Sequence, residues 1–491
     1  MVSPAPTGSK VTLYLIYLVF VTTLGPLQFG YHLAELNAPQ AVLTCEKKSI
    51  ISTHSSSSSH LPQCIPMNPS QFGLVSSIYT LGGLLGALLA GPIATKSGRL
   101  LALRATTVFF MLGSIAEASA SGIAVLSLGR LLAGVGAGAS IVVGPIFVSE
   151  IAPPQSRGFF GAFTQVMTNV GILLTQTLGY FLSKGSLWRI ILAIGAAIGC
   201  GELCGLLLVP ESPAWLAEHQ HANQARQVLQ RIRGKNADIE GEVKAWKVSS
   251  TSGHGTAEEE SLLSPPSGNL PPRNPPVTIL GAVTNAQYRP AILAVVIVMV
   301  AQQFTGINSI IMYSVSLLQS TLPTGASLLA VIISALNLVV TLACSPLPDR
   351  IGRKTCLLLS ITGMGLGSVL LALGISVGQK AVSAVASLFF VASFAVGLGP
   401  VPFILASELV GPEAVGATQS WALAANWTAT FVVAQFFPVL NDALGGRGKI
   451  YWLFAALAAL FSFLIFLRVP ETKGKCSVDE VWGRAEQRRR D

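Results

Sequence analysis

Apolar residues in this chain are grouped into long blocks instead of recurring at the three- and four-residue spacing of an amphipathic helix. A helix needs about 20 residues to cross a bilayer. Twelve blocks approach that length: 11–31, 72–94, 101–118, 123–148, 158–182, 190–209, 291–318, 327–344, 356–375, 382–406, 415–440 and 450–469. The pattern predicts an all-α membrane protein with twelve transmembrane helices.

Two hydrophilic segments interrupt this pattern. Residues 41–70 include a serine run, and residues 211–289 begin with a charged, helix-like portion. The second segment continues into a Ser/Pro/Gly-rich stretch, 248–276, whose composition is typical of disorder. The chain therefore divides into a first six-helix half (1–210, with the loop at 41–70), a central loop (211–289), a second six-helix half (290–470) and a short tail (471–491).

Three short motifs recur in the same order and at nearly one spacing. Gly98-Arg99 recurs as Gly352-Arg353, Ser149-Glu150 as Ser407-Glu408, and Pro210-Glu211 as Pro470-Glu471. The two halves are therefore predicted to be structural repeats of each other. Parallel repeats of this kind place a substrate site at their interface, near the middle of the bilayer.

Composition agrees with a membrane protein. Of 491 residues, 51% are hydrophobic and only 11% are charged, and the mean hydropathy is +0.62, whereas about a quarter of an average soluble domain is charged. The net charge of +9 comes from cations clustered between apolar blocks, so nucleic acid is not an expected partner. Most of the 31 Lys and Arg residues lie on one set of loops. The positive-inside rule therefore predicts that both termini and the central loop face the cytosol.

Short motifs at the ends and centres of the blocks form a specific set. They are Phe29-Gly30-Tyr31, Asn37-Ala38-Pro39-Gln40, Gly129-Arg130-Leu131, Ser149-Glu150-Ile151-Ala152-Pro153, Pro210-Glu211-Ser212-Pro213, Gln302-Gln303-Phe304-Thr305-Gly306-Ile307-Asn308, Asp349-Arg350-Ile351-Gly352-Arg353, Asn426-Trp427-Thr428 and Pro470-Glu471-Thr472-Lys473-Gly474. Together they resemble the sugar porters of the major facilitator superfamily, over nearly the whole chain outside the two loops. The run 29–40 is most similar to fungal vacuolar-type sugar porters and, more distantly, to facilitative glucose transporters. The resemblance implies the major facilitator fold and a secondary transporter of a sugar or sugar-like solute that works by alternating access.

A sugar site needs uncharged side chains that both donate and accept hydrogen bonds, and an aromatic face for the apolar side of the ring. Polar amides and one tryptophan lie inside the apolar blocks, at positions that resemble sugar-lining positions of the family: Gln165, Gln302, Gln303, Asn308, Asn337 and Trp427. The alternative is that these amides make hydrogen bonds between helices. We expect them to bind the solute.

Three positions differ from the resembled glucose transporters. Phe403 replaces a tryptophan, Ala395 replaces a sugar-contacting glutamate, and Thr430 replaces an asparagine. Hexose, disaccharide, polyol, myo-inositol and quinate-like solutes therefore all remain open.

Charged residues lie at the ends of the blocks predicted to face the cytosol. They are Arg99, Arg130, Glu150, Arg157 and Glu211 in the first half, and Asp349, Arg350, Arg353, Glu408 and Glu471 in the second. The resemblance implies a gating network, in which ion pairs tie the halves together while the site faces outward. The alternative is ordinary positive-inside charge.

Localisation is indicated by one string in the central loop. Glu258-Glu259-Glu260-Ser261-Leu262-Leu263 matches an acidic dileucine signal that sorting adaptors read. This favours a vacuolar or other endomembrane location slightly over the plasma membrane.

Two cysteines, Cys45 and Cys64, share the hydrophilic segment 41–70. Because this segment is predicted on the non-cytosolic side, where disulfides persist, we expect a disulfide between them. Two unrelated thiols are the alternative.

Proton-coupled transport and plain facilitated transport are both open, and the residues after Phe29-Gly30-Tyr31 bear on the choice. Proton symporters of the resembled family carry an aspartate directly after Phe-Gly-Tyr, and facilitative members carry an uncharged residue there. This chain has His32 at that position, with Glu35 three residues later on the same helix face. Ionisable residues inside a span are costly and usually functional. The alternative is a neutral His32 that replaces the uncharged residue, in a plain facilitator.

Two other classes of protein were weighed. A sugar sensor that binds without transport is the first, but sensors of the family carry long tails, and only a short one follows Val469. An enzyme is the second and is not expected, because the six histidines form no nucleophile–base or metal-ligand pattern. No cofactor or metal is expected, and the predicted partners are a small sugar-like solute and the lipid bilayer.

Overall fold

The computed structural model describes residues 11–46, 61–153, 156–234, 237–243, 277–319, 322, 325–411, 413–475 and 478–483. The stretch 248–276 and the sorting motif Glu258–Leu263 lie outside the described residues.

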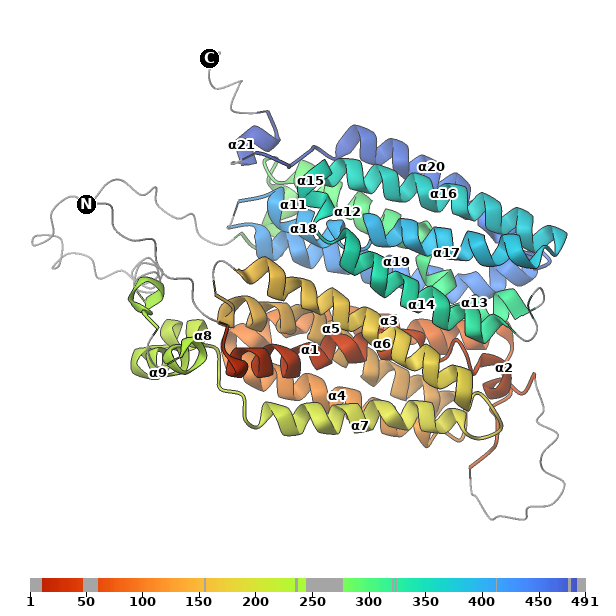
Figure 1. The fold of residues 1–491 in the computed structure, drawn as a ribbon, viewed down its shortest axis with the longest axis horizontal. Coiled ribbons are helices and arrows are strands. Elements are labelled where there is room, and N and C mark those ends of the chain that lie inside the picture. The colour runs from red at the N-terminus through yellow and green to blue at the C-terminus, as the bar shows by residue number, and fades with distance from the viewer. Residues whose placement is uncertain are drawn as a thin grey trace, which may run out of the picture.

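The first half is a bundle of six long helices. They are α1 (Leu13–Ala34), α3 (Pro69–Ser97), α4 (Arg99–Ala118), α5 (Ile123–Ile151), α6 (Arg157–Leu182) and α7 (Trp188–Leu206). The short helix α2 (Gln40–Leu43) follows α1 at one end of the bundle, and α8 (Pro213–Glu218) and α9 (Ala222–Arg233) lie at the other end (Figure 1). These two ends are called the α2 end and the α9 end.

The second half repeats this arrangement beside the first (Figure 1). Its helices are α11 (Ile279–Thr284), α12 (Arg289–Phe304), α13 (Ile307–Gln319), α14 (Ala326–Cys344), α15 (Leu347–Ile351), α16 (Arg353–Val377), α17 (Lys380–Val396), α18 (Val401–Glu408), α19 (Val415–Ala443), α20 (Ile450–Arg468) and α21 (Val478–Val481). Two spans are broken. α12 and α13 are separated at Gly306, whose φ of +95° only glycine adopts easily, and α17 and α18 are separated at residues 397–400. Broken helices of this kind expose backbone groups where a solute site can form.

The expected twelve spans are present in the described residues, and each observed end lies within three residues of the expected one. Eleven of them are long and apolar enough to cross a membrane by length and composition alone. The exception is α6, whose sequence contains Gln165, Asn169 and Gln176 together with several threonines. Large apolar side chains such as Leu89 (58% exposed) and Phe463 (60% exposed) cover the outer surface, where lipid would contact them.

Glycines bring α3 and α5 into backbone contact. A Cβ atom added to Gly138 would lie 1.8 Å from the carbonyl oxygen of Gly83, and one added to Gly134 would lie 2.0 Å from that of Tyr79. Gly134 and Gly138 therefore serve close helix packing. The backbones of the two helices are therefore in direct contact at these glycines.

A disulfide joins Cys45 and Cys64 in the loop between α1 and α3. The Ile65 amide donates to the Leu43 carbonyl at 2.8 Å, and the Trp188 indole donates to the Gln63 carbonyl at 2.8 Å. These contacts fix the described ends of the loop, at residues 43–45 and 63–65, at the α2 end of the bundle.

We expect neither Cys45 nor Cys64 to react with a maleimide in unreduced, denatured protein, and both to react after reduction. Closing a loop of this size contributes about 3 kcal/mol by the chain-entropy estimate, so the Cys45→Ser variant should also unfold at a lower temperature. Cys200, an exposed free cysteine on α7, is the internal positive control for labelling. Labelling of both loop cysteines without reductant would contradict the disulfide.

Candidate functional site

The two halves are closed against each other at the α2 end. The Asn37 amide donates to the Ser314 hydroxyl at 2.9 Å, and the Val315 amide donates to Asn37 Oδ1 at 3.1 Å. Nearby, the Ser77 hydroxyl donates to Gln435 Oε1 at 2.8 Å. These contacts join the turn after α1 to α13 and α3 to α19, so no path leads between the halves at these points.

At the α9 end, α3 and α19 separate. A cavity of about 690 Å³ lies between Pro92, Thr95 and Lys96 of α3 and Gly416, Ala417 and Ser420 of α19. Among the described residues, no ion pair joins the two halves. The structure is therefore open at the α9 end and closed at the α2 end, which is one of the two states that alternating access requires.

Four amide side chains form a hydrogen-bonded group around the break between α12 and α13, which we call amide group A (Gln302, Gln303, Asn308 and Asn426). Gln302 Oε1 accepts from Gln303 Nε2 at 3.0 Å and from Asn426 Nδ2 at 2.5 Å. Asn308 Nδ2 donates to Gln303 Oε1 at 2.6 Å, and Gln302 Nε2 donates to the Leu398 carbonyl in the break before α18. The two broken spans are thus held together by polar groups.

A second polar group, amide group B (Gln165, Asn169, Asn337 and Thr341), connects α6 of the first half to α14 of the second. Asn169 Oδ1 accepts from Gln165 Nε2 at 3.4 Å and from Asn337 Nδ2 at 3.3 Å. Asn169 Nδ2 donates to the Thr341 hydroxyl at 3.0 Å. Group B therefore crosses the interface between the halves directly.

Trp427 lies between the halves as well. Its ring packs edge-on against Phe29 at 5.7 Å and against Tyr79 at 6.3 Å. A Cβ atom on Gly83 would lie 2.4 Å from the indole, so only glycine leaves room for it. The buried indole N–H of Trp427 and the side-chain amide oxygen of Asn337, Oδ1, both lack a hydrogen-bond partner. One free donor and one free acceptor are what a hydroxylated solute can satisfy.

The six expected site residues thus fall into group A, group B and the Trp427 ring. Asn169 and Asn426 are central to the two groups, and the sequence analysis did not select them. Asn426 was visible in the motif before Trp427, and Asn169 lies four residues after Gln165, on the same face of α6. A search of the sequence for polar residues three or four positions from Gln165 would therefore have identified Asn169.

The expected gating charges form matching groups at the α9 end of each half. The Arg99 guanidinium pairs with Glu150 at 2.9 Å, and that of Arg353 pairs with Glu408 at 2.8 Å. Glu211 accepts from the Arg99 amide at 3.0 Å, and Glu471 accepts from the Arg353 amide at 2.8 Å. The repeat therefore extends to these contacts.

The ion pairs in the described residues lie within each half, and Asp349 adds to the second-half group through its 2.7 Å pair with Arg353. The ion pairs between the halves were expected only while the site faces outward, so they stay a prediction for that state. The Arg350 carbonyl accepts from Lys473, and no ion pair of its side chain is seen in the described residues. The side chain of Arg157 lies outside the described part of the structure.

The placement of Arg130 at the α9 end was wrong. α5 begins at Ile123 at the α2 end, so Arg130 lies only two turns inside that end. Its guanidinium donates to Glu35 Oε1 at 2.6 Å and to the His32 carbonyl at 2.7 Å. It also lies 4.3 Å from the centroid of the Tyr79 ring. Arg130 belongs with His32 and Glu35.

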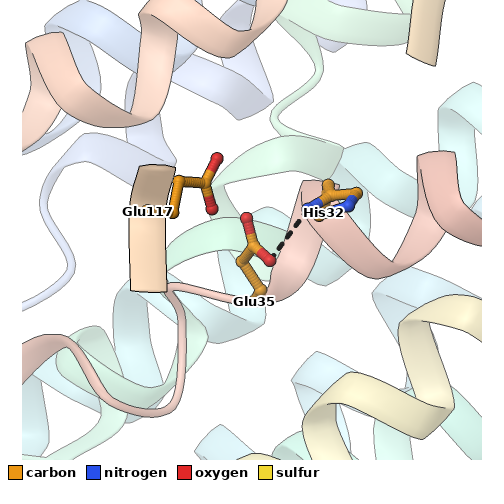
Figure 2. A group of neighbouring side chains, drawn as sticks. All are labelled: His32, Glu35 and Glu117. Atoms are coloured by element: carbon orange, nitrogen blue, oxygen red, sulfur yellow. Dashed lines mark hydrogen bonds and ion pairs between the residues drawn. The ribbon is translucent and has the colours of Figure 1, made fainter. Parts of the chain in front are cut away.

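Four charged or titratable side chains are therefore buried together near the α2 end: His32, Glu35, Glu117 and Arg130, which we call the α2-end cluster. Each is no more than 1% exposed. His32 Nδ1 lies 2.9 Å from Glu35 Oε2, and His32 Nε2 lies 3.3 Å from the Ser114 hydroxyl. Figure 2 shows the Glu117 carboxyl beside that of Glu35. The sequence analysis did not single out Glu117.

The side chains of His32, Glu35 and Glu117 offer three ligand atoms within 4.8 Å of one another, close enough to hold one metal ion. Arg130 already supplies a positive charge 2.6 Å from Glu35, however, and a divalent cation there would be repelled.

Two six-helix halves that meet at one end and part at the other, with polar groups between them, are the architecture of a secondary transporter. Comparison with known proteins agrees. The chain belongs to the Sugar (and other) transporter family, whose sequence profile matches residues 18–482.

Two yeast relatives and one solved structure illustrate the similarity. The probable metabolite transport protein YBR241C of Saccharomyces cerevisiae is 36% identical over 483 residues, which are 97% of this chain and 96% of the relative. Vacuolar protein sorting-associated protein 73 of the same yeast is 31% identical over 478 residues, 96% of each chain. The xylose transporter XylE of E. coli, in an inward-open conformation, has the same fold, with a TM-score of 0.76 at 24% identity over 96% of this chain and 99% of that one.

Proposed function

We propose that this transporter carries a sugar or a similar polyhydroxylated solute between its two halves, with amide groups A and B and Trp427 as the solute site. The observation that carries the proposal is the pair of buried, unpartnered polar atoms, Trp427 Nε1 and Asn337 Oδ1, on two different helices of the second half. An unsatisfied buried polar group costs about 1–3 kcal/mol. Solute hydroxyls that pair with both groups would recover that cost.

The proposal commits to a class of solute, not to one compound. Every group in the site is neutral, which favours hydroxyl-rich solutes over amino acids or organic ions. Uptake into proteoliposomes against a panel of labelled hexoses, polyols, myo-inositol, quinate and disaccharides would identify the solute. Solute binding without uptake would instead support a sensor, and saturable uptake of charged solutes alone would contradict the proposal.

The orientation and the membrane belong to the same proposal. We place the α9 end, both termini and the central loop in the cytosol, because the Lys and Arg residues concentrate there. The dileucine string Glu258–Leu263 and the similarity to a yeast protein named for vacuolar protein sorting favour an endomembrane, with sorting adaptors as partners.

Transport is further proposed to be coupled to protons through the cluster that contains His32 and Glu35. Buried ionisable side chains inside a span are expensive and normally serve a function. A solute-induced pH change in proteoliposomes at zero membrane potential tests the coupling.

Gln302→Ala and Gln165→Ala should each reduce the apparent affinity for the solute by about 2- to 12-fold, the equivalent of one hydrogen bond of about 0.5–1.5 kcal/mol. The variants should still fold and reach the membrane. Gln379→Ala is the matched control, since Gln379 is an exposed glutamine at the start of α17. Uptake at limiting solute that matches the parent in both variants would show that the site has been misplaced.

A further inference from the structure

The charges of the α2-end cluster do not balance. Two carboxyls, one guanidinium and one imidazole are buried in it, each no more than 1% exposed. With both carboxyls ionised and the imidazole neutral, the cluster carries one net negative charge in the membrane. An uncompensated buried charge costs several kcal/mol, so one further positive charge is needed.

Glu35 is arranged to remain ionised. One of its carboxyl oxygens accepts from Arg130 at 2.6 Å, and the other lies 2.9 Å from His32 Nδ1. Hydrogen bonds to the charged form of a carboxyl favour that form. The proton that supplies the missing positive charge is therefore not bound to Glu35.

His32 is arranged to remain neutral. If Nδ1 carries the hydrogen and donates it to Glu35, then Nε2 can accept from the Ser114 hydroxyl at 3.3 Å. The ring stacks on Phe110, with centroids 5.4 Å apart, and Gly195 leaves room for it, since a Cβ there would lie 2.7 Å from the imidazole. Both ring nitrogens have partners without an additional proton.

Glu117 is the exception. Neither carboxyl oxygen of Glu117 accepts a hydrogen bond from an N–H or hydroxyl group of the described residues, although the residue is fully buried. Its carboxyl lies beside that of Glu35, and the two can share a hydrogen bond only if one of them is protonated. An ionised carboxylate in this position would be almost unsupported, because the Arg130 Nη1 atom is already used by Glu35 and by the His32 carbonyl. The Nε atom of Arg130, by contrast, has no partner.

Other titratable groups near Glu117 are already engaged. On α3, the Tyr79 hydroxyl donates to the Phe29 carbonyl at 2.9 Å, and on α1 the Tyr31 hydroxyl donates to the Ile191 carbonyl. On α7, Arg189 reaches the end of α4, but its guanidinium donates to the Ala118 and Pro62 carbonyls, each at 2.8 Å. None of the described hydrogen bonds of these groups goes to Glu117.

We infer that Glu117 binds the proton that is exchanged during the transport cycle, with the Glu35–Arg130 pair as its fixed electrostatic partner and His32 as a positioning residue. This inference rests on the proposed proton coupling and names the residue that performs it. On release, the carboxylic acid of Glu117 gives its proton to water and becomes a carboxylate, and the free Nε–H of Arg130 lies in the same cluster to stabilise it.

The location of the cluster connects this proton to the movement of the halves. Asn37, which closes the α2 end by bonding to Ser314 and Val315, follows Glu35 by two residues. When that contact opens, water reaches the end of the bundle where Glu117 lies. When it is closed, as in this structure, Glu117 is sealed from solvent and must remain neutral.

Infrared difference spectra of the full-length protein at neutral pH test the assignment without any solute. The parent-minus-Glu117→Gln spectrum should contain the band of a protonated carboxylic acid, and the parent-minus-Glu35→Gln spectrum should contain carboxylate bands. The opposite assignment, or an ionised Glu117, would overturn the inference. So would stoichiometric binding of Zn²⁺ by the parent that Glu117→Gln abolishes, because the cluster would then be a metal site.

Proteoliposomes give the functional readout, with labelled D-glucose as the first probe and a pH-sensitive dye inside. Glu117→Gln, which imitates the protonated acid, should retain glucose exchange but lose proton movement, and Glu117→Asp should restore part of it. Glu202→Gln is the matched control. Glu202, on α7, is also a buried glutamate, but it lies outside the cluster and accepts a hydrogen bond from Gln28 Nε2 at 2.7 Å.

The outcomes separate the two proposals. A parent that transports solute without moving protons would disprove the proposed coupling and, with it, the exchange role of Glu117. A Glu117→Gln variant that moves protons as well as the parent does would disprove only the role of Glu117. Loss of proton movement in Glu202→Gln but not in Glu117→Gln would transfer the role to Glu202.

Discussion

Arg130→Ala is expected to destabilise the protein by about 3–5 kcal/mol, the usual cost of removing one partner from a buried ion pair. Glu35 would then lose its 2.6 Å contact and would remain as a buried carboxylate without a cation, beside the neutral carboxyl of Glu117. Only protonation of Glu35 as well could remove this uncompensated charge. The expected measurement is a clear fall in the unfolding temperature of purified protein, together with loss of transport.

A matched control and a rescue make this prediction specific. Arg226→Ala should have little effect, because Arg226 and its partner Glu240 are 56% and 51% exposed, and exposed pairs contribute only about 0–1 kcal/mol. Adding Glu35→Gln and Glu117→Gln to Arg130→Ala should recover part of the stability, because no unpaired carboxylate is then left. A single variant as stable as the parent would show that the Arg130 charge is not needed.

Gly138→Ala is expected to be the most damaging substitution of a single methyl group in the first half. The new Cβ would lie 1.8 Å from the Gly83 carbonyl oxygen and 2.6 Å from its carbon. Because these are backbone atoms, no side chain can move aside, and α3 and α5 must separate. Overpacking usually costs about 1–3 kcal/mol and sometimes more, so folded yield and unfolding temperature should both fall.

Gly91→Ala provides the control on the same helix pair. Gly91 lies on α3, and a Cβ there would meet nothing within 4 Å. Alanine is preferred to glycine in helices by about 0.8–1.0 kcal/mol, so this variant should be as stable as the parent or slightly more so. Equal losses in both variants would mean that helix contact is not what Gly138 provides.

The spans were predictable because lipid imposes a length and an apolar composition on any helix that crosses it. The kinds of residue in the site were also predictable, since amides inside apolar blocks are conspicuous. Their partners were not, because the bond from Asn169 to Thr341 joins residues of different halves that only the packed bundle brings together.

The misplacement of Arg130 has a different origin. It was assigned by motif alone, although the direction of α5, which starts at Ile123, already puts Arg130 at the α2 end. Glu117 was overlooked because it lies in the last turn of an apolar block, where an acid is usually solvated. Its burial arises in the folded bundle, where α5 packs against it at Gly129.

The polar character of α6 has a consequence for how the chain enters the membrane. The helix falls outside the set that length and composition alone assign to the bilayer, and charged or polar residues lower the tendency of a segment to insert by itself. Asn169 finds its partners on α14, and Gln176 donates to the Ile311 carbonyl of α13 at 3.3 Å. Both of those helices are synthesised long after α6. During biogenesis the first half must therefore hold α6 among its own helices before the contacts of Asn169 and Gln176 with α14 and α13 can form, and these contacts become complete only when the second half arrives.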